Sequence, residues 1–256
     1  MLTVISPAKS LDYDTPPVTD EFTLPTQLTQ SRKLVRRLRE LNASDIAKLM
    51  GVSDSIAELN VKRYKQWKTP FKPGNARQAI FAFKGDVYIG FDAYSMTDDN
   101  IEFAQQNLRI LSGLYGILRP LDLMQPYRLE MGTRLDTDAG GNLYQFWDGR
   151  ITRSLNKELE ATGSNTLINL ASNEYFKSVK PKLLEAEIIT PAFRDYHKGD
   201  YRFIQFFGKK ARGLLARFIV DERITEPEDL KSFDREGYRY NPELSNPQDW
   251  VFTRKQ

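Results

Sequence analysis

The sequence predicts one domain of mixed α/β (α+β) class that spans residues 1–256. A length of 256 residues with 40% hydrophobic residues is typical of one large domain with a substantial buried core. Residues 26–67 repeat apolar side chains at a helical period, whereas the chain after residue 74 alternates β-rich or apolar runs with helix candidates. No internal repeat, low-complexity tract or long linker divides the chain.

The amino-terminal part predicts one strand followed by helices. Residues 2–6 form an apolar run that indicates a buried strand ended by Pro7, and the proline-spaced stretch up to Pro25 indicates a surface connection. Between residues 26 and 67 we expect three helices joined by tight turns, with Ser53 as the N-cap of the third.

The rest of the chain predicts a mixed topology. The β-rich or apolar runs are residues 79–91, 166–172, 187–193, 201–207 and 250–255. Helix candidates alternate with them near residues 99–111, 148–161 and 209–221, and the polar stretch 226–249 is expected to be rich in loops.

The composition excludes several kinds of chemistry. Without any cysteine, the chain forms no disulfide, no iron–sulfur cluster and no cysteine zinc site. The single histidine, His197, excludes a site with two or three histidines, and its place in an expected hairpin loop argues against serine–histidine catalysis. The chain lacks a P-loop and a Rossmann glycine fingerprint, although an all-carboxylate magnesium site stays open. We therefore expect no cofactor and no dedicated metal site.

Targeting signals are also absent from the pattern. The start, MLTVISPAKS, has no basic region followed by a long apolar stretch, so we interpret it as a strand and not as a signal peptide. No apolar run approaches the roughly 20 residues of a membrane-spanning helix. A cytoplasmic location without membrane contact is the expectation.

Basic residues gather in two clusters, although the net charge is only +3. The clusters comprise Arg32, Lys33, Arg36, Arg37, Arg39, Lys48, Lys62, Arg63, Lys65, Lys68 and Lys72, and then Lys198, Arg202, Lys209, Lys210, Arg212 and Arg217. Lysine and arginine supply most of the non-specific affinity for nucleic acid because they displace counterions from phosphates. Such clusters predict either phosphate contacts or a solvated basic face.

The stretch IAKLMGVSDSIAELN, residues 46–60, resembles a helical hairpin that grips DNA. In a helix-hairpin-helix, the second helix presents free amide N–H groups to a phosphate, and Gly51 supplies the left-handed turn residue that the hairpin needs. A sequence-reading helix-turn-helix is disfavoured, because Asp54 and Glu58 would face the phosphates. The alternative is a structural corner in which Gly51 is an ordinary helix C-cap.

Four motifs together resemble the YaaA family of peroxide stress response proteins. They are SPAKSLDY at 6–13, LSGLYGILRPLDLMQPYRLEMG at 111–132, NLASNEYFKSV at 169–179 and GKKARGLLARFI at 208–219. The resemblance implies a single domain of an unusual, family-specific fold with a role in peroxide defence, limitation of free intracellular iron and DNA repair. It further implies DNA binding through a positively charged cleft and a helix-hairpin-helix near residues 42–67. The hairpin then falls on Met50, Gly51, Val52 and Ser53, with Ser53 in place of the second glycine.

The first functional hypothesis is therefore a DNA-binding protein of the oxidative stress response. It would hold duplex or distorted DNA largely without sequence specificity. The candidate DNA-binding residues are Arg32, Arg36, Arg37, Lys48, Gly51, Val52, Ser53, Lys209, Lys210 and Arg212, and the cleft candidates are Arg119, Tyr127 and Arg128.

The alternative hypothesis is an enzyme that acts on a nucleobase or nucleotide. Lys9 or Lys209 would be an amine nucleophile, and Asp122 or Glu130 a general acid or base. Against a catalytic role, the opposite charges of Arg119, Asp122, Arg128 and Glu130 at short spacing favour a salt-bridge network that fixes their loop. Direct iron chelation is disfavoured, because the ligands would be nearly all carboxylates.

Overall fold

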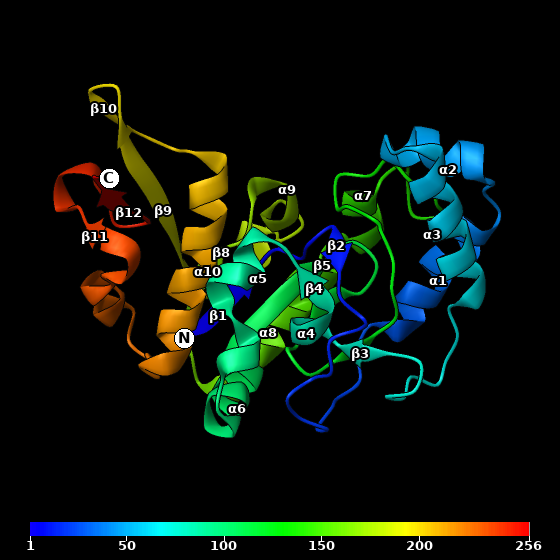
Figure 1. Cartoon of the computed structure of the whole chain (residues 1–256), viewed down its shortest axis with the longest axis horizontal. Coiled ribbons are helices and arrows are strands. Elements are labelled where there is room, and N and C mark those ends of the chain that lie inside the picture. The colour runs from blue at the N-terminus through cyan, green and yellow to red at the C-terminus, as the bar shows by residue number, and fades with distance from the viewer. Residues whose placement is uncertain (256) are drawn as a thin grey trace.

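A mixed eight-stranded sheet forms the centre of the molecule in the computed structural model, which describes residues 1–255 (Figure 1). Its strands are β1 (Leu2–Ile5), β5 (Leu108–Ser112), β6 (Gly116–Leu118), β8 (Thr166–Leu170), β9 (Glu187–His197), β10 (Asp200–Arg202), β11 (Arg239–Tyr240) and β12 (Asp249–Arg254). The strand order is β11-β12-β9-β8-β1-β5-β6, and β10 pairs with β9. The neighbours β5, β1, β8, β9 and β12 are parallel, whereas the remaining pairs are antiparallel. The predicted mixed α/β class is confirmed.

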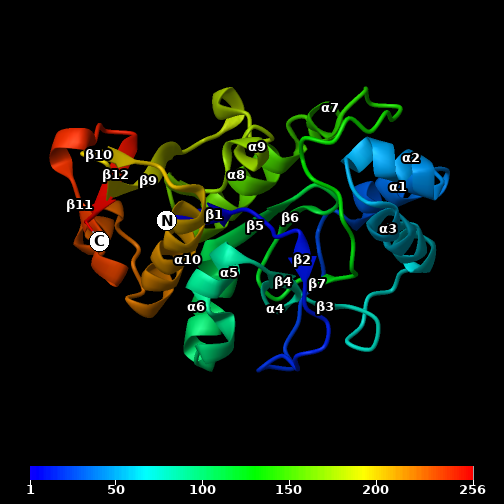
Figure 2. The same ribbon diagram turned by 45° about the horizontal axis from the view of Figure 1, so that its top comes forward.

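Helices cover both faces of this sheet. One layer contains α5 (Asp86–Phe91), α6 (Asp98–Asn107) and α10 (Gln205–Asp221), and the opposite layer contains α8 (Arg150–Thr162) and α9 (Asn173–Phe176) (Figure 2). Every residue of β1, β5 and β8 is buried, as expected for parallel strands covered on both sides. Most of their side chains are apolar, although Arg109 and Asn169 are buried polar exceptions.

The amino-terminal helices stand at one end of the molecule, at the right of Figure 1. They are α1 (Leu28–Arg39), α2 (Ala43–Met50) and α3 (Asp54–Gln66), which confirms the three predicted helices. Leu34, Val35 and Leu38 form the buried stripe of α1. Ser53 occupies the N-cap position of α3 as predicted, but its side chain makes no capping hydrogen bond.

Shorter elements connect these layers. They are β2 (Ser10–Leu11), β3 (Arg77–Gln78), α4 (Ala79–Ala82), β4 (Phe83–Lys84), β7 (Leu123–Met124), α7 (Leu143–Trp147) and the 3-10 turns Ala93–Ser95, Pro181–Leu183, Pro227–Ser232, Arg235–Gly237 and Pro242–Leu244. None of the helices in residues 1–255 combines the length and the hydropathy that crossing a membrane requires.

Three predictions about elements were wrong in part. The strand expected over residues 201–207 ends at Arg202, and α10 already begins at Gln205. Residues 79–91 form mostly helix (α4 and α5) and only a short strand, because this apolar segment is buried by tertiary packing that leaves no period to identify it. The helix expected over residues 99–111 ends at Asn107, and its last part belongs to β5. A short apolar run that is buried on all sides does not distinguish a helix from a strand.

Candidate functional site

A cavity of about 390 Å³ opens at the carboxyl ends of β1 and β8. Ser6 follows β1 and Ser172 follows β8, and the Ser6 hydroxyl accepts a hydrogen bond of 2.8 Å from the Ser172 amide. Tyr88 of α5 donates to the Ser6 carbonyl oxygen at 3.1 Å. Ligands of open α/β sheets bind at this edge, between two neighbouring strands whose onward connections run to opposite sides of the sheet. Here the chain continues from β1 toward the β5 side and from β8 toward β9. We call this cavity the edge cavity.

The edge cavity brings together four residues that sequence patterns had singled out: Lys9, Glu130, Lys209 and Arg212. Lys9 Nζ lies 3.3 Å from Glu130 Oε1, and Arg128 Nη2 lies 3.1 Å from the same oxygen. The Glu130 carboxylate is thus shared by two cations, and the Lys9 side chain is 66% exposed. The predicted salt-bridge interpretation holds for Glu130, although this pair also faces a cavity.

Arg212 lines the edge cavity from α10 without any anionic partner. Burial lowers the pKa of its guanidinium, and no carboxylate among residues 1–255 opposes this effect. The Phe203 ring centroid lies 5.9 Å from its guanidinium carbon. An arginine in this state is a cation with unused hydrogen-bond donors at the wall of a cavity.

Asp122, the other proposed acid or base, does not line the edge cavity. Its carboxylate is 2% exposed and forms an ion pair of 3.1 Å with Arg119. The Thr23 hydroxyl donates to it at 2.6 Å and the Arg119 amide at 2.8 Å. These contacts assign Asp122 and Arg119 to a buried pair that fixes their loop.

We expect Asp122→Asn to lower the free energy of unfolding by about 1–3 kcal/mol, because the buried donors lose a charged acceptor. Urea unfolding would measure this effect, with the exposed Asp138→Asn as the control. An Asp122→Asn protein as stable as the control would contradict a structural role for the Arg119–Asp122 pair.

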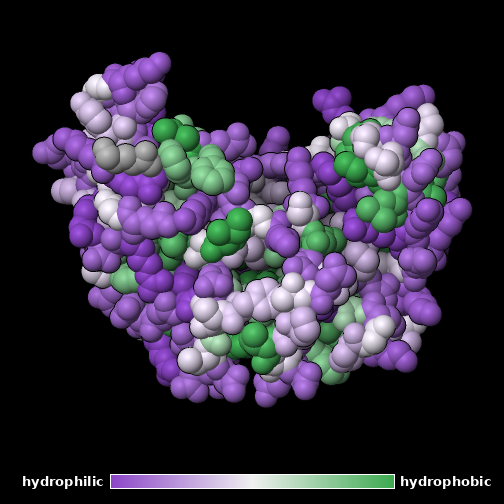
Figure 3. Space-filling view, in the orientation of Figure 1, coloured by the Kyte–Doolittle hydropathy of each residue, from purple (hydrophilic) through white to green (hydrophobic). Residues whose placement is uncertain are grey.

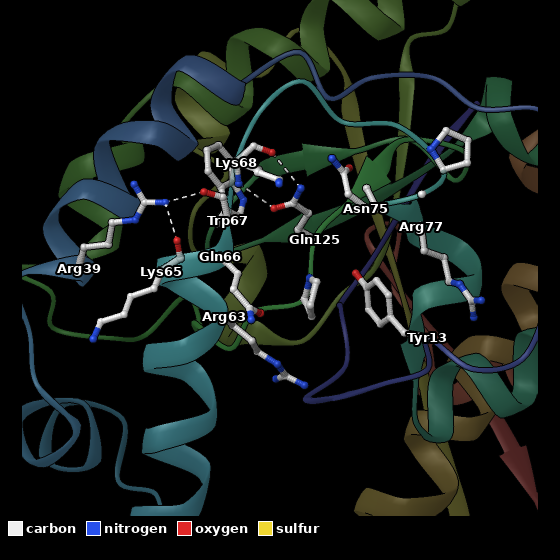
Figure 4. A pocket seen from close by; sticks show the side chains of 14 residues that line it. Tyr13, Arg39, Arg63, Lys65, Gln66, Trp67, Lys68, Asn75, Arg77 and Gln125 are labelled. Atoms are coloured by element: carbon white, nitrogen blue, oxygen red, sulfur yellow. Dashed lines mark hydrogen bonds between the residues drawn. The ribbon is translucent and has the colours of Figure 1, made fainter.

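A second and larger cavity, of about 850 Å³, lies beside the end of α3 (Figure 4). Five cations line it: Arg39, Arg63, Lys65, Lys68 and Arg77. Its lining within residues 1–255 contains no acidic residue. Aromatic side chains of Tyr13 and Trp67 share the wall. We call this cavity the basic cavity.

The five cations of the basic cavity differ in how they are held. Arg39 donates to the carbonyl oxygens of Tyr64 and Trp67 at the end of α3. The helix dipole stabilises a cation at this end of a helix. Arg77 lies 3.6 Å from Asp12. Arg63 has no ion pair within the described chain, and burial lowers its pKa. Figure 4 shows Lys65 and Arg63 extending from α3, while hydrogen bonds join Gln125 to the backbone of Lys68.

Residues 125–130 connect the two cavities. Gln125 and Pro126 line the basic cavity, whereas Glu130 lines the edge cavity. Tyr64 of α3 donates a hydrogen bond to the Arg128 carbonyl oxygen. Tyr127, a predicted cleft residue, is buried, and its hydroxyl lies 2.6 Å from that of Ser112.

The predicted hairpin residues lie at an exposed tip. Gly51 adopts the left-handed conformation, with φ of 60°, and accordingly ends α2 as predicted for either interpretation of the segment. Lys48, Gly51 and Ser53 are exposed, whereas Val52 is half-buried. A helical hairpin is therefore present, and its contact with DNA stays a prediction.

The other predicted cations are more dispersed. Arg36 and Arg37 line a hollow that also contains Asp136 and Asp138, and Arg37 pairs with Glu40 at 2.8 Å. Arg32 donates to the Thr69 hydroxyl. Lys210 pairs with Glu236 and does not line the edge cavity, unlike its neighbour Lys209. The basic runs of the sequence are thus divided among several surfaces.

Sequence patterns missed the importance of Arg63 and Lys84. Arg63 was one of many residues in the first basic cluster, and only its missing partner and its burial distinguish it. Lys84 lines the edge cavity from a segment whose fold the sequence did not predict. No local signal identifies either residue.

Comparison with known proteins identifies the family. A family model described as peroxide stress protein YaaA matches residues 1–244. The chain belongs to the YaaA family. A UPF0246 protein of Aliivibrio fischeri is 58% identical over 256 residues, which cover 100% of this chain and 99% of the relative. UPF0246 proteins of Hahella chejuensis (56% identical, 99% of each chain) and Teredinibacter turnerae (54% identical, 100% of each chain) are similar over the same length.

Membership in the YaaA family gives the chain a place among peroxide stress proteins. The resemblance predicted from four motifs is confirmed over nearly the whole chain. The edge cavity is built from all four of these motifs, since Lys9, Glu130, Ser172 and Lys209 each come from a different one. The motifs thus gather around one cavity, although they are far apart in the sequence.

Proposed function

We propose that the protein binds DNA during peroxide stress, holds duplex or distorted DNA largely without sequence specificity, and so limits oxidative DNA damage. The observation that supports this proposal most directly is the basic cavity, whose described lining contains five cations and no carboxylate. An effect on free iron would then be indirect, because the chain has no cysteine and one histidine.

The shape of the molecule is compatible with a bound duplex. In Figure 3 the upper outline is indented between the two ends of the molecule. The helical hairpin of α2 and α3 stands on one side of this indentation, and the β9–β10 hairpin with the start of α10 stands on the other (Figure 1). Each of these two ends carries an exposed cation, Lys48 on α2 and Arg202 on β10. Clefts lined by one sign of charge raise the local concentration of a polyanion.

The DNA-binding proposal predicts a steep salt dependence. Fluorescence anisotropy of labelled duplex, bubble and single-stranded DNA across a salt series would measure it, with Arg63→Gln and Lys65→Gln as test variants. Each variant is expected to weaken all three forms of DNA and to reduce the slope of log K against log salt by about one. Gly51→Asp tests the hairpin separately, since a carboxylate there would repel phosphate.

The matched control is Lys182→Gln, which removes an exposed positive charge from the 3-10 turn that packs near α8. Affinity that does not change with salt would sink the proposal. If Lys182→Gln and Arg63→Gln lost the same affinity for DNA, the binding would depend on overall charge and not on the basic cavity.

A second candidate function follows from the Lys9–Glu130 contact of 3.3 Å in the edge cavity. The Lys9 amine would attack the aldehyde carbon of an abasic site and lose water to form an imine, and Glu130 would transfer the proton. Borohydride reduces such an imine to a stable amine. Wild type should then be trapped on abasic duplex, and Lys9→Arg should not be trapped. If wild type binds abasic DNA but forms no adduct after reduction, this reaction is rejected.

A further inference from the structure

We propose that the edge cavity binds a phosphate monoester, with Lys209 and Arg212 as the residues that hold the phosphate. This inference does not depend on DNA binding. It names a ligand class for the cavity in which the second candidate reaction is placed.

The charges around the edge cavity are only partly paired with one another. Four cations and three carboxylates line it. Lys9 pairs with Glu130 at 3.3 Å, and Lys84 pairs with Asp12 at 3.5 Å. Within the described chain, Lys209 and Arg212 have no carboxylate within 4.0 Å, the limit for an ion pair.

The two remaining carboxylates do not neutralise these cations. Glu174 accepts a hydrogen bond of 2.9 Å from the Gly132 amide. Asp86 lies in the first turn of α5, where a helix stabilises negative charge. The unbalanced positive charge is therefore concentrated on one wall of the cavity, where Lys209 and Arg212 lie three residues apart on α10 and face the same side.

The Arg212 guanidinium is unfavourable in its free energy when no anion is bound beside it. A half-buried guanidinium without an anion is unfavourable, because its partial desolvation is not offset by a partner. The Phe203 ring beside it, with its centroid 5.9 Å from the guanidinium carbon, packs so closely on Gly208 that a Cβ there would lie 2.3 Å from this ring. Sites that hold an uncompensated charge in a cleft are candidates for function.

The hydrogen-bond donors of Lys209 and Arg212 match the oxygens of a phosphate monoester. Arginine presents a planar fork of N–H donors that fits the oxygens of phosphate, and lysine adds a compact charge. A phosphate monoester carries a charge of about −1.5 to −2 at pH 7, which balances two cations better than a diester does. The volume of about 390 Å³ lies within the usual range for small-molecule sites, and the cavity lies at the ligand-binding edge of the sheet.

Isothermal titration calorimetry would test this inference with inorganic phosphate, ribose 5-phosphate, a nucleoside 5′-monophosphate and the matching nucleoside without phosphate. Wild type should bind the phosphorylated compounds and not the free nucleoside. Arg212→Gln should weaken binding about 10- to 100-fold, Arg212→Lys should restore part of it, and Lys209→Gln should weaken it to a smaller extent.

Lys210→Gln is the matched control, because Lys210 is adjacent in sequence but pairs with Glu236 outside the edge cavity. It should bind the phosphate compounds as wild type does. Circular dichroism of every variant checks the fold, and Lys209→Gln at an exposed position keeps the test valid if Arg212→Gln unfolds.

Oligonucleotides with a 5′-phosphate or a 5′-hydroxyl distinguish the source of the monoester. Preference for the 5′-phosphorylated end places a DNA terminus in the cavity, whereas equal binding of both ends with retained mononucleotide binding identifies a free small molecule. No heat of binding for any phosphate compound, or equal binding by Arg212→Gln, overturns the inference. DNA affinity is tested separately by Arg63→Gln. A negative result for phosphate binding is therefore distinguishable from a negative result for DNA binding.

Discussion

Gly213→Ala is expected to lower the free energy of unfolding by more than about 3 kcal/mol, because a side chain at this position has no space. Its Cβ would lie 1.9 Å from the Val87 carbonyl oxygen and 2.9 Å from the Phe91 amide nitrogen. Both obstacles are backbone atoms of α5, so no side-chain rotation relieves the overlap. A Cβ on the facing Gly90 would likewise lie 2.2 Å from the Lys210 carbonyl oxygen.

The same substitution should also disturb the edge cavity, since α5 supplies Tyr88 and α10 supplies Lys209 and Arg212. Urea unfolding measures the change in stability, and calorimetry with a nucleoside monophosphate measures the change in binding. Gly74→Ala is the matched control, because nothing lies within 4 Å of a Cβ there and its backbone is not left-handed. Equal stability of the two variants would show that α5 and α10 are not held in close contact.

The second large effect is expected at alkaline pH. Burial raises the pKa of the six buried tyrosine side chains in the folded protein: Tyr64, Tyr88, Tyr115, Tyr127, Tyr175 and Tyr238. In the unfolded chain these phenols would titrate near pH 10. Below that pH both states keep the protons, so these groups cause no pH dependence.

Above about pH 10 the unfolded chain releases protons that the folded protein retains, and the free energy of unfolding falls. Each tyrosine contributes about 1.4 kcal/mol per pH unit, so the six together contribute about 8 kcal/mol per pH unit. Since domains are stable by roughly 5–15 kcal/mol, unfolding should occur within one or two units above pH 10.

A titration that follows tyrosinate absorbance and circular dichroism together would measure this transition. The tyrosinate of these buried side chains should appear in one step with the loss of secondary structure, whereas the urea-unfolded chain should titrate gradually around pH 10. Gradual formation of tyrosinate in a protein that stays folded would contradict the burial of these side chains.

Much of the fold could be predicted because its elements have clear local signals. The stripe of Leu34, Val35 and Leu38 predicts α1, and the apolar runs of β1 and β8 predict buried strands. The segment of α4 and α5 could not be predicted, since its structure depends on contact between Gly90 and α10, which is far away in the sequence.

The candidate site was predicted in its residues but not in its grouping. Motifs identified Lys9, Glu130, Lys209 and Arg212, yet sequence alone could not separate Lys209 from Lys210. Successive residues of a helix point about 100° apart, so one of the two lysines faces the edge cavity and the other faces Glu236. Which charges pair internally depends on tertiary contacts.

The hydrogen bond from Tyr64 to the Arg128 carbonyl oxygen has a thermodynamic consequence. It ties α3, beside the basic cavity, to the segment that positions Glu130 in the edge cavity. If both cavities bind the proposed ligands, a ligand that shifts this segment from one side would change the affinity on the other side. Linkage requires the factor to be equal in both directions, so a compound that tightens DNA binding must itself bind more tightly when DNA is present.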